Sequence, residues 1–373
     1  MIKIAADSQI LNIEQKLSEF FADEYSLKYF ESDQLTSTDL QDVDALLVRS
    51  TVRVNKELCA DSQIQFVGST TAGINHLDTK YLDSQNISWS HAPGCNACSV
   101  THYVMAVLGM LIEDGLFNIR QSVGIIGYGN IGKKLYQLLS ALNIQVYVYD
   151  PFLNDAHLVN MDKVLACDLV TIHVPYSLEG PHPTSNLINQ SHKKLLEDKT
   201  LINTSRGGIV SEDLVIELDD LIYVADVWLD EPTPSIPIIQ KAFISTPHIA
   251  GYSIEGKSNG TSTVAIECAR AFNCYEENNL SANNLIKWPH GLGNIVRDIH
   301  AYGFPIAIFK SELNLRSISN ILKNTSQHEL AKEFNNSRAN HPSRNDFNKY
   351  SFEGIIDLDE LINLEFFNTI KNT

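Results

Sequence analysis

The chain has 373 residues, of which 44% are hydrophobic and 20% charged, a composition typical of globular rather than disordered proteins. This length predicts two or three domains. The formal net charge of −17 argues against nucleic acid or an anionic membrane as a partner.

The longest apolar run, residues 103–112, is too short to cross a bilayer, so we expect no membrane association. The first residues lack the apolar core and cleavage pattern of a signal peptide, which favours a cytoplasmic location. The six cysteines include the pair Cys95 and Cys98, but no second pair or histidine pair stands at zinc spacing. We therefore expect no metal and no disulfide framework.

Short strands alternate with helical stretches in the first part of the chain. Strands are predicted at residues 2–6, 44–49 and 64–68, and a helix at 11–22. This alternation indicates a parallel α/β sheet, in which ligands bind at the carboxyl ends of the strands. Polar loops follow two of these strands, and their candidate substrate ligands are Ser50, Thr51, Arg53 and Thr71. Each of these residues alone is also an ordinary turn former.

Residues 122–132 form the stretch around which the chain is organised. They predict a buried strand, a glycine turn and the start of a helix, with glycines at the G-x-G-x-x-G spacing of a dinucleotide site. The first glycine permits the turn, the second allows a pyrophosphate to approach the backbone, and the third lets helix and strand pack closely. The helix then directs free N–H groups at the phosphates. The predicted cofactor contacts here are Gly127, Gly129, Asn130, Ile131 and Gly132.

Asp150 ends the next predicted strand, 18 residues after Gly132. A carboxylate at this position can accept hydrogen bonds from both ribose hydroxyls and would repel a 2′-phosphate, so NAD is favoured over NADP. The alternative is an ordinary strand–turn–helix with a solvated aspartate.

Four further strands are predicted after Asp150, at residues 168–175, 200–208, 221–228 and 243–248. Because parallel strands end at one edge of a sheet, their polar ends should gather there. The side chains expected at that edge are Asp150, His173, Arg206, Asp226 with Glu231, and His248.

An NAD site beside an arginine, a glutamate and a histidine suggests hydride transfer involving a hydroxy acid. His248 suits the base that removes the hydroxyl proton, since imidazole titrates near neutral pH. Glu231 could fix its tautomer, and Arg206 could bind the substrate carboxylate with two parallel hydrogen bonds. A structural role is the alternative for His248 and is favoured for His173 and His102. Asp226 could contact the nicotinamide amide or cap a loop.

The chain is expected to contain three domains. Residues 1–97 and 250–286 form a substrate (lid) domain, 98–249 the NAD-binding domain, and 287–373 a small C-terminal α+β domain with a helix near 311–322. No internal repeat or low-complexity tract is found.

These motifs resemble those of the D-isomer-specific 2-hydroxyacid dehydrogenase family. The stretches that carry the resemblance are residues 127–132 with Asp150, 203–208, 226–228 with 231–232, and 247–251. The resemblance implies a Rossmann-type doubly wound parallel sheet domain inserted in a split, flavodoxin-like substrate domain. It also implies that Arg206, Glu231 and His248 are the catalytic set.

Residues 48–50, 92–97 and 248–257 resemble one branch of that family, whose members oxidise 4-phospho-D-erythronate at C2 with NAD in pyridoxal 5′-phosphate biosynthesis. The C-terminal segment resembles the dimerisation domain of that branch, which implies a homodimer. The implied substrate contacts are Ser50, Thr71 and Tyr252. The implied NAD contacts are Asp150, Val174, Thr204, Ser205, Arg206, Asp226 and Gly251.

The substrate phosphate also needs a basic binding site, and our hypothesis is that Arg49, Arg53 and Lys257 supply it. Two alternative functions remain at this stage. One is a sister dehydrogenase acting on D-3-phosphoglycerate or another D-2-hydroxy acid, and the other is a non-catalytic scaffold that senses NADH.

Overall fold

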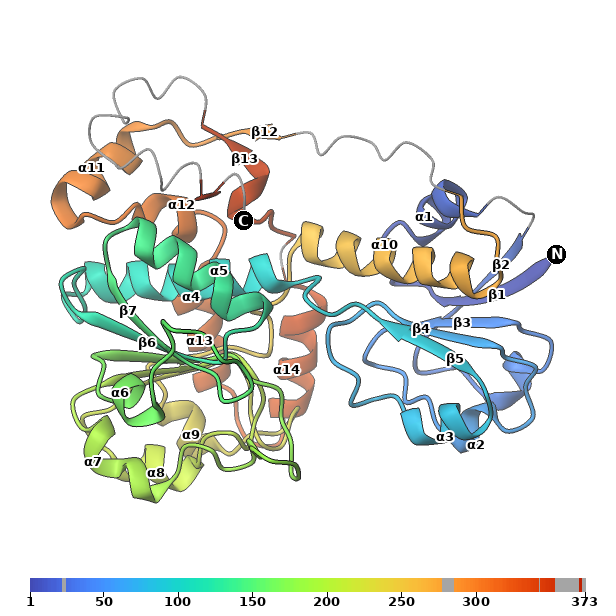
Figure 1. Cartoon of the computed structure of the whole chain (residues 1–373), viewed down its shortest axis with the longest axis horizontal. Coiled ribbons are helices and arrows are strands. Elements are labelled where there is room, and N and C mark those ends of the chain that lie inside the picture. The colour runs from blue at the N-terminus through green and yellow to red at the C-terminus, as the bar shows by residue number, and fades with distance from the viewer. Residues whose placement is uncertain (22–24, 277–284, 342, 353–368, 371–373) are drawn as a thin grey trace. The chain divides into compact units, whose positions relative to one another are not determined.

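The structure is a computed structural model that describes residues 1–21, 25–276, 285–341, 343–352 and 369–370 (Figure 1). The chain divides into two compact units. Unit 1 contains residues 1–96 and 253–284, and unit 2 contains residues 97–252 and 285–373. The C-terminal segment, 285–373, thus groups with the nucleotide-binding residues in unit 2.

Unit 1 is built on a five-stranded, fully parallel sheet of order β2-β1-β3-β4-β5. Its strands are β1 (Ile2–Asp7), β2 (Tyr25–Phe30), β3 (Ala45–Val48), β4 (Phe66–Ser69) and β5 (Ser88–His91). Its helices are α1 (Ile13–Phe20), η1 (Ser37–Leu40), α2 (Lys56–Cys59), α3 (Thr79–Ser84) and α10 (Ile254–Ala271). The chain thus leaves unit 1 after β5 and returns as α10.

Apolar cores lie on both faces of this sheet. On one face α1 and α10 pack together, burying residues such as Leu17 and Val264. On the other face η1, α2 and α3 cover residues such as Leu46 and Leu82. Because both faces are covered, β3 and β4 are buried along their whole length, as parallel strands normally are.

Unit 2 contains a six-stranded, fully parallel sheet of order β11-β10-β9-β8-β6-β7. Its strands are β6 (Ser122–Ile126), β7 (Gln145–Tyr149), β8 (Leu169–Ile172), β9 (Thr200–Asn203), β10 (Ile222–Ala225) and β11 (Ile244–Ser245). Strand order reverses between β6 and β8, and ligands bind at such a switch point in open α/β sheets.

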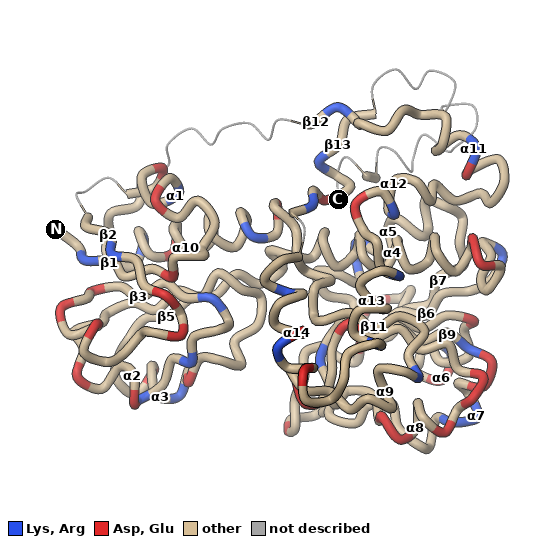
Figure 2. Tube along the Cα trace, turned by 180° about the vertical axis from the view of Figure 1, so that it is seen from behind, with Lys and Arg blue, Asp and Glu red and all other residues tan. Residues whose placement is uncertain are grey.

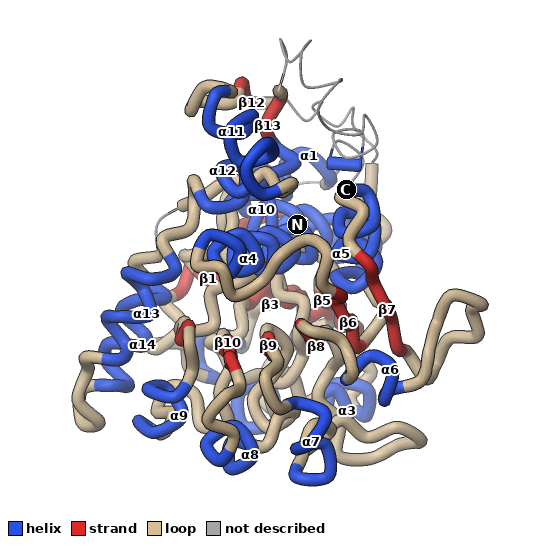
Figure 3. Tube along the Cα trace, turned by 90° about the vertical axis from the view of Figure 1, so that its left-hand side faces the viewer, coloured by secondary structure: helices blue, strands red, loops and turns tan. Residues whose placement is uncertain are grey.

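Helices cover both faces of this sheet (Figure 3). One layer contains α4 (Ala97–Glu113) and α5 (Asn130–Ala141). The other contains α6 (Met161–Leu165), α7 (Lys193–Leu196) with η2 (Gln190–His192), α8 (Glu212–Glu217) and α9 (Ile236–Lys241). Helix α4 is apolar on nearly all sides, which is typical of a helix buried all round.

The C-terminal segment completes the burial of α4. It contains α11 (Gly293–Tyr302), α12 (Ile306–Lys310), α13 (Leu315–Lys323), α14 (Leu330–Ala339), η3 (Phe347–Lys349) and the parallel pair β12 (Ile286–Lys287) and β13 (Tyr350–Ser351). Helix α12 packs on α4, and α13 packs on β11. The segment therefore shares its apolar core with the nucleotide-binding sheet.

The predicted α/β class and parallel sheets are confirmed. Strands β2 and β5 were not predicted; β2 is a sheet edge with half-exposed side chains, so it lacks the apolar run of a buried strand. The predicted helix near 311–322 corresponds to α13, which begins and ends slightly later.

In the part of the chain that is described, no helix is long and apolar enough to span a membrane. Within the same residues no group of three or more histidine, cysteine or acidic side chains could hold a metal ion. Acidic positions are spread over the surfaces of both units rather than gathered in one place (Figure 2).

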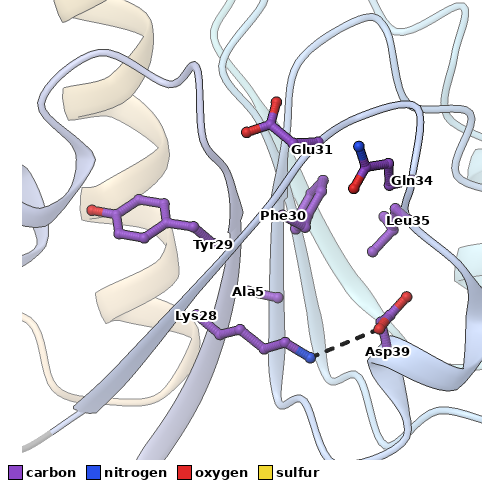
Figure 4. Close-up of a pocket in the computed structure, with 8 residues that line it drawn as sticks. All are labelled: Ala5, Lys28, Tyr29, Phe30, Glu31, Gln34, Leu35 and Asp39. Atoms are coloured by element: carbon purple, nitrogen blue, oxygen red, sulfur yellow. Dashed lines mark ion pairs between the residues drawn. The ribbon is translucent and has the colours of Figure 1, made fainter.

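A surface pocket of about 310 Å³ lies in unit 1, around the end of β2. Lys28 and Asp39 face each other across it at 3.9 Å (Figure 4). None of the predicted site residues lines this pocket.

Candidate active site

The three glycines of the turn between β6 and α5 are required for different reasons. Gly127 has φ +97°, and a Cβ there would overlap the carbonyl of His173. A Cβ on Gly132 would overlap the carbonyl of Gly127. A Cβ on Gly129 would meet no protein atom within 4 Å. The fold thus requires Gly127 and Gly132, whereas the absence of a side chain at Gly129 leaves open space in front of the helix.

That open space lies at the amino end of α5. Gly129 is the N-cap residue and offers no side chain to the first-turn N–H groups, and Asn130 begins the helix. These donors and the helix dipole suit a phosphate. Asp150 lies next to the turn, because its carboxylate accepts hydrogen bonds from the N–H of Tyr128 at 2.9 Å and of Phe152 at 3.0 Å. The predicted dinucleotide fingerprint and its acidic partner are therefore adjacent in the structure.

The ends of β8 and β9 are joined by Ser205. Its hydroxyl donates to the carbonyl of Ile172 at 2.6 Å and accepts from the N–H of Val174 at 3.2 Å. Thr204, also buried, lies 3.4 Å from the imidazole of His173. Three predicted cofactor contacts, Val174, Thr204 and Ser205, therefore form one connected wall beside the glycine turn.

His173 has the structural role that the sequence favoured. Its Nε2 lies 2.9 Å from the hydroxyl of Thr171, and burial lowers its pKa to about 3. A neutral, hydrogen-bonded imidazole of this kind carries no charge at neutral pH.

Arg206 follows β9 and is half-buried. Its Nη1 donates to the carbonyl of Ser205 at 2.7 Å, and the side-chain amide of Asn203 donates to the carbonyl of Arg206 at 3.0 Å. Burial lowers the pKa of Arg206, and the charge of Glu231 acts in the opposite direction. The guanidinium therefore lies close enough to Glu231 for their charges to interact.

Glu231 and His248 form the central pair of the site. Nδ1 of His248 lies 2.7 Å from Oε2 of Glu231, while the N–H of Trp228 donates to Oε1 at 3.0 Å. Burial by itself would raise the pKa of Glu231, but the hydrogen bond and charge of His248 outweigh it, so this pKa is lowered. The carboxylate is thus ionised and can only accept, which places the proton on Nδ1. Nε2 of His248 has no hydrogen-bond partner among the described residues and can accept a proton.

Asp226 holds the loop that carries His248. Its Oδ1 accepts from the hydroxyl of Thr246 at 2.6 Å and from the N–H of Ile249 at 2.8 Å, and its Oδ2 accepts from the N–H of Ala250 at 2.9 Å. His248 itself has φ +57°, an uncommon backbone conformation that the surrounding contacts must maintain. Asp226 is 1% exposed, and burial raises its pKa to about 6. The structure thus shows the loop-capping role that was one of the two alternatives for this residue.

Arg344 holds the same loop from the C-terminal segment. It is 1% exposed and donates to the carbonyl of Ala250 at 2.9 Å and to the carbonyl of Ser99 at 3.1 Å. It also forms a buried ion pair with Asp346 at 3.2 Å and contacts His102 at 3.3 Å. The structural role favoured for His102 agrees with this placement, because its Nε2 lies 3.0 Å from the carbonyl of Phe309.

Gly251 and Tyr252 follow this loop directly, in unit 2. The hydroxyl of Tyr252 accepts a 3.2 Å hydrogen bond from Nε of Arg338, whose guanidinium carbon lies 5.8 Å from the ring centre. Sequence reasoning missed Arg338, since it lies in the C-terminal segment and belongs to no recognisable motif. Its placement beside Tyr252 depends on the packing of α14.

The other predicted substrate residues, Ser50 and Thr71, lie in unit 1 at the carboxyl ends of β3 and β4. Ser50 is exposed, whereas the hydroxyl of Thr71 lies 2.9 Å from that of Ser69 and donates to the carbonyl of Gly73 at 3.1 Å. Both polar side chains therefore stand at the sheet edge where the alternation of strands and helices predicted them.

A basic cluster occupies the same edge of unit 1. Arg49 donates through Nε to the buried carboxylate of Asp7 at 3.0 Å. Burial, followed by the positive charge of Arg49, lowers the pKa of Lys257. The charge of Arg49 therefore acts on Lys257, and Arg53 is exposed in the loop after β3. The phosphate-binding role of these three residues remains a prediction.

Comparisons with known proteins agree with this geometry. Residues 116–250 match the family model described as "D-isomer specific 2-hydroxyacid dehydrogenase, NAD binding domain". Among solved structures, the 3-phosphoglycerate dehydrogenase of Entamoeba histolytica with bound NAD+ superposes with a TM-score of 0.61 at 21% identity, covering 73% of this chain and 95% of that one. This likeness confirms the predicted fold, and the matched family domain identifies NAD as the cofactor.

Two sequence relatives extend the similarity over most of the chain. An erythronate-4-phosphate dehydrogenase from Pseudoalteromonas translucida is 40% identical over 272 residues, which cover 70% of this chain and 72% of the relative. One from Cellvibrio japonicus is 32% identical over 370 residues, 94% of each chain, so the similarity includes the C-terminal segment. The chain therefore belongs to the erythronate-4-phosphate dehydrogenases, within the D-isomer-specific 2-hydroxyacid dehydrogenase family.

Proposed function

We propose that this protein oxidises 4-phospho-D-erythronate at C2 to (R)-3-hydroxy-2-oxo-4-phosphooxybutanoate, with reduction of NAD to NADH and release of one proton, in pyridoxal 5′-phosphate biosynthesis. The observation that carries this proposal is the 2.7 Å hydrogen bond between His248 and Glu231, with the charge of Arg206 beside it. A proton acceptor next to a carboxylate-binding cation is what dehydrogenation of a hydroxy acid requires.

The residues around the glycine turn fit the cofactor. The open space at Gly129, the uncapped amino end of α5 and the adjacent carboxylate of Asp150 suit a pyrophosphate and a ribose without a 2′-phosphate. Val174, Thr204 and Ser205 would line the rest of the site, together with Gly251. When bound, NAD supplies the acceptor for the hydride that leaves C2.

Three side chains then perform the remaining chemistry. Nε2 of His248 accepts the proton of the C2 hydroxyl, and Glu231 stabilises the imidazolium that forms, at a contribution of about 10²–10⁴ in rate for such base catalysis. Arg206 binds the substrate carboxylate and favours the developing carbonyl through its charge. Asp226 contributes by holding the His248 loop, and a further contact of its own with NAD remains a prediction.

Ser50, Thr71 and Tyr252 are proposed to contact the substrate. Arg49 and Lys257 are proposed to supply positive charge for its phosphate, because like charges held near each other favour binding of an anion. Replacing either by alanine should raise KM for the phosphorylated acid. An unchanged KM in both variants would remove them from this role.

Residues 287–373 are proposed to form the dimerisation domain of a cytoplasmic homodimer. The basis is the resemblance of this segment to the dimerisation domain of the family branch named above; the alignment with the Cellvibrio japonicus relative, over 94% of the chain, includes the segment. Light scattering at micromolar concentration should give twice the chain mass, and a monomer would contradict the proposal.

The decisive experiment measures NADH formation from 4-phospho-D-erythronate, with D-3-phosphoglycerate and other D-2-hydroxy acids as comparisons. We expect the four-carbon phosphoacid to give the highest kcat/KM. A preference for D-3-phosphoglycerate would identify a sister dehydrogenase instead. His248→Ala should abolish turnover but leave NADH binding nearly intact, whereas a non-catalytic scaffold would show no turnover to lose.

A further inference from the structure

Helix α14 carries a row of residues spaced four apart, Leu330, Phe334 and Arg338. The first two are fully buried in the apolar core beneath the nucleotide-binding sheet, where they join Leu322 of α13. Because positions four apart lie on one face of a helix, Arg338 extends the same face beyond the apolar core. The packing of the helix therefore fixes the backbone position from which the Arg338 side chain extends.

Arg338 reaches the active site at Tyr252. Its Nε donates to the Tyr252 hydroxyl at 3.2 Å, and the guanidinium carbon lies 5.8 Å from the centre of the Tyr252 ring. Burial raises the pKa of Glu231, and the interactions with His248 and the N–H of Trp228 lower it; the charge of Arg338 adds a smaller lowering effect. Arg338 thus brings a second guanidinium, besides Arg206, into the electrostatic neighbourhood of the catalytic pair.

The two terminal nitrogens of Arg338 have no hydrogen bond or ion pair within the described part of the chain. Among the described residues, Arg338 donates a hydrogen bond only from Nε, so the flat fork of Nη1 and Nη2 remains available. Such a fork matches two oxygens of a phosphate or carboxylate. A half-buried arginine with one nitrogen anchored and two available is organised to bind an anion.

We propose that Arg338 is a specificity-determining residue that binds the phosphate of the substrate through Nη1 and Nη2, while Tyr252 orients the guanidinium. This proposal rests on the proposed function, which supplies an anionic group two carbons from the reacting C2. Arg206 is then reserved for the carboxylate, and Arg338 adds a two-point contact to the phosphate besides the positive charge proposed for Arg49 and Lys257. The C-terminal segment would thereby contribute directly to substrate selection.

The test compares 4-phospho-D-erythronate with D-erythronate in the wild type and in Arg338→Ala, Arg338→Lys and Lys332→Ala. Lys332 is exposed on the same helix, so its replacement changes the charge equally without touching the site. Arg338→Ala should lower kcat/KM for the phosphorylated acid by about 10–100-fold, mainly through KM, because a charge-assisted pair of hydrogen bonds is lost. Turnover of D-erythronate should change by less than about threefold, and Arg338→Lys should be intermediate.

Inorganic phosphate gives a second readout that does not depend on turnover of D-erythronate. It should inhibit the wild type competitively against the phosphoacid, with an inhibition constant that rises at least about tenfold in Arg338→Ala and stays unchanged in Lys332→Ala. Equal losses on both acids, or an unchanged inhibition constant, would show that Arg338 only supports Tyr252 and would overturn the proposal. A wild type that forms no NADH from the phosphoacid but oxidises another hydroxy acid would instead refute the proposed function.

Discussion

Nδ1 of His248 and Oε2 of Glu231 lie 2.7 Å apart, although 17 residues separate them along the chain. The bond joins the loop after β10 to the loop after β11, which are neighbouring strands of the parallel sheet. Because this bond occupies Nδ1, it is Nε2 that we propose as the proton acceptor.

Glu231→Gln should lower kcat by about 10²–10⁴-fold with a smaller effect on KM, because an amide keeps the size of the side chain but cannot stabilise the imidazolium. Steady-state NADH formation measures both constants. Asp230→Asn is the matched control, since Asp230 is the exposed neighbour. A fall in kcat equal to that of the control would remove Glu231 from the mechanism.

Alanine at two glycines of the same turn should have opposite consequences. Gly129→Ala places its Cβ in open space, so stability should change by less than about 0.5 kcal/mol while NADH binding weakens at least about tenfold. Gly127→Ala places a residue with a side chain at φ +97° and its Cβ against the His173 carbonyl. The free energy of unfolding should therefore fall by about 1–3 kcal/mol or more. NADH titration and urea unfolding distinguish the two effects. Normal NADH affinity in Gly129→Ala would contradict the proposed pyrophosphate site.

His173 should make the protein sensitive to acid. Burial lowers its folded pKa to about 3 from an ordinary value of 6.5, so the unfolded chain binds the proton first as the pH falls. The buried neutral His173 therefore contributes to the free energy of unfolding. This contribution is complete above pH 6.5 and is lost as the pH falls toward 3. Its loss between pH 7 and 5 should be about 2 kcal/mol.

His173→Gln should flatten this acid dependence, measured by denaturant unfolding with Trp228 and Trp288 as the fluorophores of unit 2. Asp226, whose pKa is raised by burial to about 6, acts with the opposite sign between pH 3.8 and 6, so wild type and variant must be compared directly. The exposed His328→Gln serves as control. Parallel curves for the wild type and His173→Gln would contradict the prediction.

Arg344→Met should lower the free energy of unfolding by about 3–5 kcal/mol, because it leaves Asp346 buried without its cation. Adding Asp346→Asn should recover part of the loss. The surface ion pair between Arg316 and Asp114 provides the comparison, and Arg316→Met should change stability by no more than about 1 kcal/mol. Similar losses of unfolding free energy in Arg344→Met and Arg316→Met would show that burial does not make the Arg344–Asp346 pair more stabilising than a surface pair.

Much of the site could be predicted from local patterns. The glycine turn could be predicted because its constraint is local: a Cβ on Gly132 would overlap the carbonyl of Gly127. Asp150 then follows at the spacing expected for the motif. Arg206, Glu231 and His248 could be placed at one sheet edge because each follows a buried apolar run. Loop capping by Asp226 was one of two alternatives that the sequence left open. The contact of Arg344 with the same loop could not be predicted, since Arg344 lies 96 positions after His248.

The sequence by itself determined the parallel α/β architecture and the glycine turn, and it placed the proposed catalytic side chains at one sheet edge, because strand, turn and helix signals are local and parallel strands must end at a common edge. Only the tertiary structure decided which nitrogen of His248 bonds Glu231, which groups the oxygens of Asp226 accept from and that Arg338 contacts Tyr252. These relations depend on long-range packing of the C-terminal helices against the sheet, and no residue spacing encodes the position of a side chain that is fixed by a distant core.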